Sequence, residues 1–111
     1  MLSQHIGQFT CEVKREDDRA VVLPRGELDM ATVGAVDQEL RRLHDEGIRK
    51  ILLDLRGLTF LDSSGLHLVV RWAGEASKDG FELELEPGPP AVQRIFSLTA
   101  LEDTLPWRRN D

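Results

Sequence analysis

The stretch of the chain that decides the fold is residues 48–66, which read IRKILLDLRGLTFLDSSGL. Residues 48–55 carry a nearly continuous apolar run, which is typical of a β-strand covered on both faces. After a loop that we expect over residues 56–61, apolar side chains recur at helical spacing from Ser63 to about Lys78. A buried strand that leads into a helix predicts an α/β architecture with this strand at its centre.

The segments before this stretch predict a β-hairpin and a helix. Apolar residues alternate with polar ones over residues 9–13, and a second β-prone run covers residues 20–23. A helix is expected after Asp29, which we predict as its N-cap, because the apolar residues that follow share one helical face. These residues are Val33, Val36, Leu40 and Leu43. Gly47 is expected to end this helix.

The segments after this stretch add one strand and one helix. Apolar residues alternate with glutamates over residues 81–86, as expected of a strand near a sheet edge with one wet face. Asp79-Gly80 should end the preceding helix. Gly88-Pro89-Pro90 introduces a third helix, because proline is tolerated in a first helical turn. The residues from Glu102 onward give no clear prediction.

Length and pattern together predict one fold. With 111 residues the chain has room for a single domain, whose core we expect over about residues 8–105. The expected fold is α/β, with a mixed central sheet of about four to five strands and helices after an N-terminal hairpin. The sheet should be parallel where helices make the crossovers.

Charge and residue usage argue against several kinds of partner. A formal net charge of −6 would repel a polyanion, so no direct nucleic-acid partner is expected. No apolar stretch approaches the roughly 18 residues of a membrane span, so no membrane partner is expected. A single cysteine, Cys11, and a start without a leader-like pattern predict a cytoplasmic protein. One cysteine and three dispersed histidines predict no metal site.

The segment that could carry chemistry is Asp62-Ser63-Ser64-Gly65. The free N–H groups of a helix start favour anions, so the fold could accommodate a phosphate esterified to Ser64. Gly65 costs about 1 kcal/mol relative to alanine within a helix turn, which indicates that a partner protein or a kinase comes close there. An equally good explanation needs no function: Asp62 caps the helix, the serines are small first-turn residues, and Gly65 relieves crowding against the sheet.

Asp29 is a second candidate at the start of a helix. Its simplest role is that of an N-cap. If the crossovers bring both helix starts to the same end of the sheet, however, Asp29 would lie near Ser64. The two would then form part of one recognition surface.

Three motifs taken together resemble the bacterial anti-sigma factor antagonist family of STAS domains. They are Gly26-Glu27-Leu28-Asp29, Ile51-Leu52-Leu53-Asp54-Leu55 and Leu58-Thr59-Phe60-Leu61-Asp62-Ser63-Ser64-Gly65-Leu66. Residues 90–96 are similar to a later helix of that family, and the resemblance covers about residues 8–105. The tetrapeptide Asp-Ser-Ser-Gly alone is weak evidence for this family. Its position after the strand at residues 51–55 and beyond Gly-Glu-Leu-Asp makes the combination fairly specific for the family.

The resemblance implies a phosphorylation-controlled partner switch. The unmodified antagonist would bind an anti-sigma factor, often also its serine kinase, and so free a sigma factor; phosphorylation at Ser64 would break the complex. The partner surface is then expected at Asp29, Asp62, Ser63, Ser64, Gly65 and His67. The kinase would supply ATP and magnesium and a separate serine phosphatase would reverse the modification, so the chain itself is expected to hold no cofactor.

Two features depart from the family's pattern. His67 stands where many relatives have a small residue, which could alter the choice of partner. Many relatives continue into a further helix where this chain has only residues 105–111, so the sequence does not predict how the C-terminal segment packs.

Two other functions compete with the switch. The order strand, turn, serine, helix is also that of a hydrolase nucleophile elbow, but Ser64 has Asp62 and Leu66 where an elbow needs glycines. We therefore expect no enzyme. The stronger alternative is a STAS domain that is never phosphorylated and serves as a docking module of a stress-signalling scaffold or a transport system.

Overall fold

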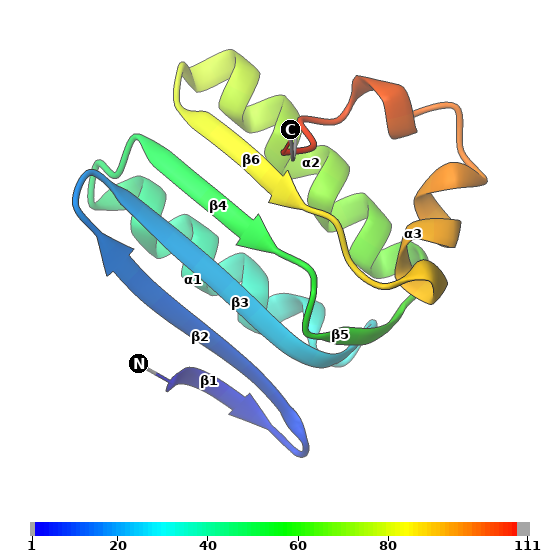
Figure 1. The fold of residues 1–111 in the computed structure, drawn as a ribbon. Coiled ribbons are helices and arrows are strands. Elements are labelled where there is room, and N and C mark those ends of the chain that lie inside the picture. The colour runs from blue at the N-terminus through cyan, green and yellow to red at the C-terminus, as the bar shows by residue number, and fades with distance from the viewer. Residues whose placement is uncertain (1, 109–111) are drawn as a thin grey trace.

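The computed structural model of the chain describes residues 2–108. Within them the strands are β1 (Leu2–Ile6), β2 (Phe9–Glu16), β3 (Arg19–Leu28), β4 (Lys50–Asp54), β5 (Leu58–Leu61) and β6 (Glu82–Glu86). The helices are α1 (Val33–Asp45), α2 (Ser63–Asp79), α3 (Pro90–Ser97) and the short 3₁₀ helix η1 (Glu102–Thr104). In Figure 1, α1 and α2 lie behind the sheet, on one of its faces. The mixed α/β fold predicted from the sequence is confirmed.

The sheet is antiparallel at its N-terminal side and parallel beyond β3. Its main path runs β1-β2-β3-β4-β6, and β5 pairs with β3 beside this path. β1, β2 and β3 pair antiparallel, whereas β4 with β3, β6 with β4 and β5 with β3 are parallel pairs. The crossover from β3 to β4 is made by α1, so the predicted link between helical crossovers and parallel pairing holds.

The main path of the sheet has five strands, within the predicted four to five, and β5 brings the total among the described residues to six. β1 and β5 are the two strands that the sequence did not predict. β5 occupies part of the predicted loop over residues 56–61. Its terminal leucines are buried while Thr59 and Phe60 are exposed, so the chain does not show the alternation that signals a strand. Residues 2–6, for which the sequence predicted no element, form β1 and pair with β2.

Two glycines end helices as predicted. Gly47, with φ of 84°, follows α1, and Gly80, with φ of 74°, is the C-cap of α2. Both adopt the left-handed conformation that glycine adopts without steric cost. The predicted start of α1 is wrong by three residues, because the N-cap is Thr32 and not Asp29.

The core lies between the sheet and the helices. Val22, Leu53 and Leu85 are fully buried and lie opposite one another on β3, β4 and β6. Leu68 and Trp72 of α2 are also buried and belong to the same cluster. The apolar run that predicted a covered strand therefore forms the middle of the packed layer.

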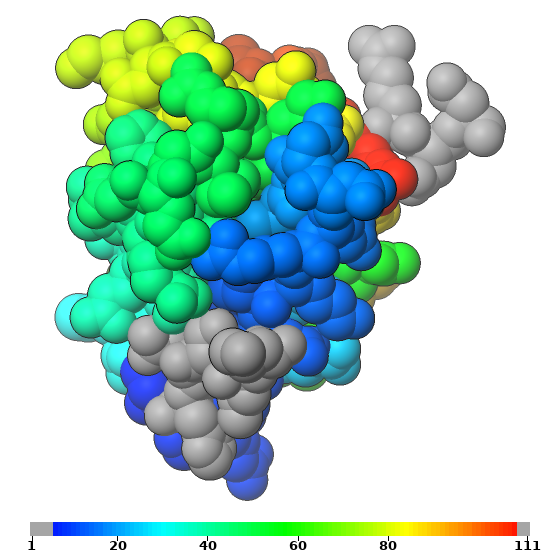
Figure 2. Space-filling model, turned by 90° about the vertical axis from the view of Figure 1, so that its left-hand side faces the viewer, coloured from blue at the N-terminus to red at the C-terminus, as the bar shows by residue number. Residues whose placement is uncertain are grey.

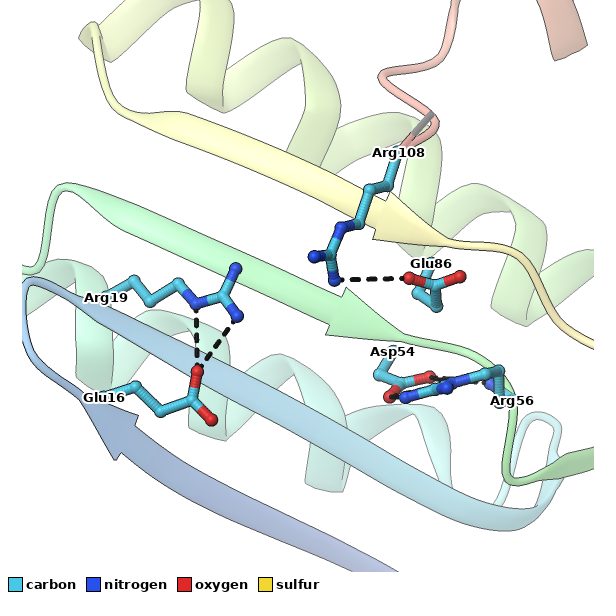
Figure 3. Close-up of polar contacts among 6 residues, drawn as sticks. All are labelled: Glu16, Arg19, Asp54, Arg56, Glu86 and Arg108. Atoms are coloured by element: carbon cyan, nitrogen blue, oxygen red, sulfur yellow. Dashed lines mark hydrogen bonds and ion pairs between the residues drawn. The ribbon is translucent and has the colours of Figure 1, made fainter. Parts of the chain in front are cut away.

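Charged side chains pair on the other face of the sheet, toward the viewer in Figure 3. Asp54 on β4 is paired with Arg56 at 2.8 Å, and Glu86 on β6 with Arg108 at 3.5 Å. Asp54 and Glu86 are only 4% and 8% exposed. Each of these buried carboxylates is therefore paired with an arginine.

The turns between elements gather at the two ends of the strands. Figure 2 shows one end, where the β2–β3 hairpin lies against the start of β4. At this end Lys50 pairs with Asp18 at 3.1 Å, and Arg15 pairs with Glu46 at 2.7 Å. The parallel strands finish at the opposite end, which carries the candidate site.

The C-terminal segment packs along β6. Trp107 forms a parallel bridge with Leu85, and its ring meets Phe96 edge to face at 5.0 Å. Leu85 N–H donates to Pro106 O at 2.9 Å. The C-terminal packing that the sequence left open is thus defined as far as Arg108; the predicted tail beyond it lies outside the described residues.

Candidate functional site

The site begins where β3 and β5 end side by side. Leu28 lies opposite Leu61 in the parallel pair, and Asp62 N–H donates to Leu28 O at 3.2 Å. The next residues, Asp29 and Asp62, are therefore neighbours at one end of the sheet. The prediction that both helix starts meet at the same end is confirmed.

Asp62 caps α2, as predicted. Its Oδ1 accepts from the backbone N–H of Ser64 at 2.8 Å and of Gly65 at 3.3 Å. Ser63 is exposed and Ser64 is half-buried in this first turn. Within residues 2–108 neither serine hydroxyl has a hydrogen-bond partner, so both are free to react or to bind.

Gly65 is explained by packing. The residue is buried, and a Cβ placed on it would lie 2.9 Å from Leu61 Cγ and 3.1 Å from Leu28 Cγ. The first distance is shorter than Cβ contacts in folded proteins and the second is tight, so a larger residue would force α2 and the two leucines apart. Of the two explanations open from the sequence, relief of crowding against the sheet is the one that this contact supports.

Asp29 lies in the turn before α1 and is not its cap. Its Oδ1 accepts from Ala31 N–H at 3.0 Å, and its own N–H donates to Thr32 Oγ1 at 3.0 Å. The physical reason for the wrong prediction is that an aspartate binds backbone N–H groups in a tight turn as readily as at a helix start. Asp29 is half-buried, one residue beyond the strand pair that sets it beside Asp62.

Two exposed apolar residues flank these carboxylates and were missed. Met30 follows Asp29 and is 80% exposed, and Phe60 on β5 is 47% exposed. His67, one turn into α2, is also exposed. Phe and Met are among the residues that are enriched in protein-binding surfaces. The sequence gives no signal for this, because Leu58, Phe60 and Leu61 are all apolar and only their burial in β5 shows that Phe60 is the exposed one.

A cavity of about 460 Å³ opens beside Asp29. It is lined by Ile6, Gly7, Gln8, Phe9, Gly26, Glu27, Asp29, Ala31, Thr32 and Thr59. Its walls come from the β1–β2 turn, from the end of β3 and from β5. The cavity therefore borders the surface that contains Asp29, but it does not include Ser64.

The comparisons with known proteins agree with this architecture. The family model described as "Mlab, STAS domain" matches residues 11–106. The chain belongs to the STAS domain family. This match covers the strands β3 to β6, α1 to α3 and most of β2, and thus the predicted site residues Asp29, Asp62, Ser63, Ser64, Gly65 and His67.

The relatives of this STAS domain share its size as well as its fold. The anti-sigma-B factor antagonist of Staphylococcus aureus is 29% identical over 94 residues, which are 85% of this chain and 87% of that protein. The crystal structure of an anti-sigma factor antagonist from Mycobacterium paratuberculosis is 27% identical and superimposes with a TM-score of 0.82. The superposition covers 93% of this chain and 87% of that one.

A third relative has been solved in two states of modification. SpoIIAA, described as an anti-sigma factor antagonist and a Bacillus cell fate determinant, is 20% identical in both structures. The unphosphorylated form gives a TM-score of 0.75 over 91% of this chain and 88% of that one. The phosphorylated form gives 0.70 over 91% of each chain. At this identity the likeness concerns the fold.

Other kinds of site find little support in the described part of the chain. Among residues 2–108 no helix is long and apolar enough to cross a membrane. The same residues contain no group of three or more potential metal-binding side chains. His44, the histidine with a described partner, lies 3.2 Å from Asp79 at the end of α2 that is remote from Ser64.

Proposed function

We propose that this STAS domain is an anti-sigma factor antagonist controlled by phosphorylation of Ser64. Its unphosphorylated form binds a kinase-type anti-sigma factor and so releases a sigma factor. Phosphorylation by that kinase, with ATP and magnesium, breaks the complex, and a serine phosphatase restores it. The chain acts in the cytoplasm by binding and not by catalysis.

The observation that carries this proposal is the environment of Ser64. Ser64 is half-buried in the first turn of α2, which Asp62 caps, and its hydroxyl has no hydrogen-bond partner among the described residues. A kinase can therefore reach the hydroxyl without breaking a bond inside the protein. The names of the curated relative and of the M. paratuberculosis structure support the anti-sigma partner.

The same environment explains why a phosphate would break a complex without unfolding the protein. A phosphate adds about two negative charges at a helix start, where the dipole is favourable. On the surface, however, it joins the carboxylates of Asp29 and Asp62 beside the apolar Phe60. A partner that fits this surface would have to desolvate an added charge without a counter-charge, which costs several kcal/mol.

Mass spectrometry tests the modification. The chain is incubated with each purified kinase-type anti-sigma factor of the source organism and Mg-ATP, and the products are mapped by peptide. One phosphate on Ser64 is expected, with Ser63→Ala modified as fully as the wild type and Ser64→Ala unmodified. A phosphate on any other residue, or on none with every kinase, would contradict the assignment.

Calorimetry tests the partner switch. Ser64→Ala should bind the same kinase as tightly as wild type, and Ser64→Asp should bind at least about tenfold more weakly. Ser77→Asp is the matched control, because Ser77 is exposed on the same helix at its opposite end. Equal binding by Ser64→Asp and Ser77→Asp would refute the role of charge at Ser64.

A docking module that is never phosphorylated is the second candidate function. The description of the matching family model, "Mlab, STAS domain", does not name an antagonist, which favours keeping this candidate. Affinity capture with wild type and Ser64→Asp separates the two. A scaffold or transport component held equally by both variants, with no kinase among the captured proteins, would favour the docking module.

A further inference from the structure

Thr32 is a buried polar residue whose hydroxyl is not used to cap its own helix. It is 7% exposed and occupies the N-cap position of α1, yet it makes no side-chain bond to that helix. A threonine at this position usually accepts from a backbone N–H two or three residues ahead. Here the hydroxyl points backward instead, into the turn that holds Asp29.

The hydroxyl joins both sides of that turn. Thr32 Oγ1 donates to Glu27 O at 2.7 Å and accepts from Asp29 N–H at 3.0 Å. The backbone of Thr32 also donates to Asp29 O at 3.1 Å, and Ala31 N–H binds the Asp29 carboxylate at 3.0 Å. Asp29 is therefore held through its N–H, its C=O and its side chain, and Thr32 contacts all three, since its Oγ1 also lies 3.3 Å from Asp29 Oδ1.

This arrangement matters because of what lies next to it. Asp29 follows Leu28, and Leu28 pairs with Leu61. Leu61 is in turn followed by Asp62, which caps the helix turn that contains Ser64. Met30, 80% exposed, projects from the same turn. A bond network that fixes this turn also fixes how Asp29 and Met30 are presented beside Ser64.

We propose that Thr32 is a positioning residue for partner recognition, which acts by holding Asp29 and Met30 in the geometry that the anti-sigma partner meets. This inference rests on the proposed function for the identity of the partner. It assigns the role to the hydroxyl and not to the bulk of the side chain. A surface whose contact groups are held before binding loses less conformational entropy on association.

Three variants separate the hydroxyl from the shape of the side chain. Thr32→Val keeps the shape and removes the hydroxyl, whereas Thr32→Ser keeps the hydroxyl. Thr99→Val is the matched control, because Thr99 Oγ1 likewise donates to a carbonyl, Phe96 O at 2.8 Å, and accepts from Leu101 N–H at 3.2 Å. Circular dichroism and thermal unfolding confirm that each variant is folded before binding is measured.

Binding to the purified kinase-type anti-sigma factors is measured by calorimetry. Thr32→Val should bind about tenfold more weakly, while Thr32→Ser and Thr99→Val stay within about twofold of wild type. In an Asp29→Ala background, Thr32→Val should have a clearly smaller further effect, because one of the two side chains that it positions is gone while Met30 remains. Equal affinity of Thr32→Val and wild type, or an undiminished loss in the Asp29→Ala background, would overturn the proposal.

Amide hydrogen exchange tests the hydrogen bond from Asp29 N–H to Thr32 Oγ1 in the absence of a partner. The Asp29 N–H should exchange at least about tenfold faster in Thr32→Val than in Thr32→Ser, because its acceptor is lost. Unchanged exchange would overturn the inference even where the wild type binds the kinase. If the wild type binds no kinase, the recognition role of Thr32 is refuted together with the proposed function. Faster exchange in Thr32→Val would then show only that the hydroxyl stabilises the turn.

Discussion

Replacing Gly65 by alanine tests why a glycine stands in the first turn of α2. The new Cβ would lie 2.9 Å from Leu61 Cγ and 3.1 Å from Leu28 Cγ and Cδ2. Two of these atoms are branch carbons of leucines that are at most 1% exposed, so they have little room to retreat. Overpacking of this kind costs about 2–3 kcal/mol, and the better helix propensity of alanine returns about 1 kcal/mol. We expect a net loss of about 1–2 kcal/mol.

Gly74 provides a matched control in the same helix. A Cβ on Gly74 would have no neighbour within 4 Å, so Gly74→Ala should stabilise the protein by about 0.5–1 kcal/mol through helix propensity alone. Urea unfolding followed by circular dichroism measures both variants, and a 1 kcal/mol change should shift the melting temperature by about 4 °C. If Gly65→Ala is as stable as Gly74→Ala but loses partner binding, the packing explanation is refuted and the glycine serves the approach of a partner.

Three further outcomes are expected. Asp62→Ala should lower the free energy of unfolding by about 1 kcal/mol in the same urea assay, because two N–H groups of α2 lose their acceptor, and Asp62→Asn should restore most of it. Burial raises the pKa of Asp54, but the hydrogen bonds and charge of Arg56 outweigh burial and hold that pKa below its usual value. The ionised Asp54 carboxylate therefore contributes its full stabilisation of the fold above about pH 4, and this contribution is lost as the pH falls through the lowered pKa. In Asp54→Asn, the free energy of unfolding should therefore depend less on pH below about pH 4. Burial, with a smaller contribution from the charge of Glu39, raises the pKa of the Cys11 thiol to about 12, so a disulfide reagent at pH 8 should modify it only after denaturant is added.

Periodicity alone was enough to predict the layered part of the fold. The apolar run at Ile51-Leu52-Leu53 is buried on both faces of β4, and the predicted helices begin and end near Gly47, Gly80 and Pro90. These signals are local: each depends on the spacing of side chains within one element or on the conformation of one residue. The predicted elements are present in the fold because no contact between distant segments favours another local structure there.

The parts that could not be predicted depend on contacts between distant segments. β5 is a strand because β3 offers it a parallel partner, and nothing within residues 58–61 shows that pairing. Asp29 and Thr32 are both good capping residues, and the hydrogen bonds of the whole turn decide which one begins α1. From the sequence, Asp29 was therefore wrongly predicted as a cap, and the choice between the two explanations of Gly65 needed the contacts of its position with Leu28 and Leu61.

The unpredicted strand is what assembles the site. Without β5, the chain after β4 would lead directly to α2, and no pairing would tie the Ser64 turn to the end of β3. The pairing of Leu28 with Leu61 puts Asp29 beside Asp62, and Gly65 lets α2 lie close to both leucines. The same contacts that close the core at this end therefore bring the hydroxyl, the two carboxylates and the exposed Phe60 onto one surface. A change that loosens this pairing should thus weaken partner binding and stability together, whereas a change at Ser64 should alter binding alone.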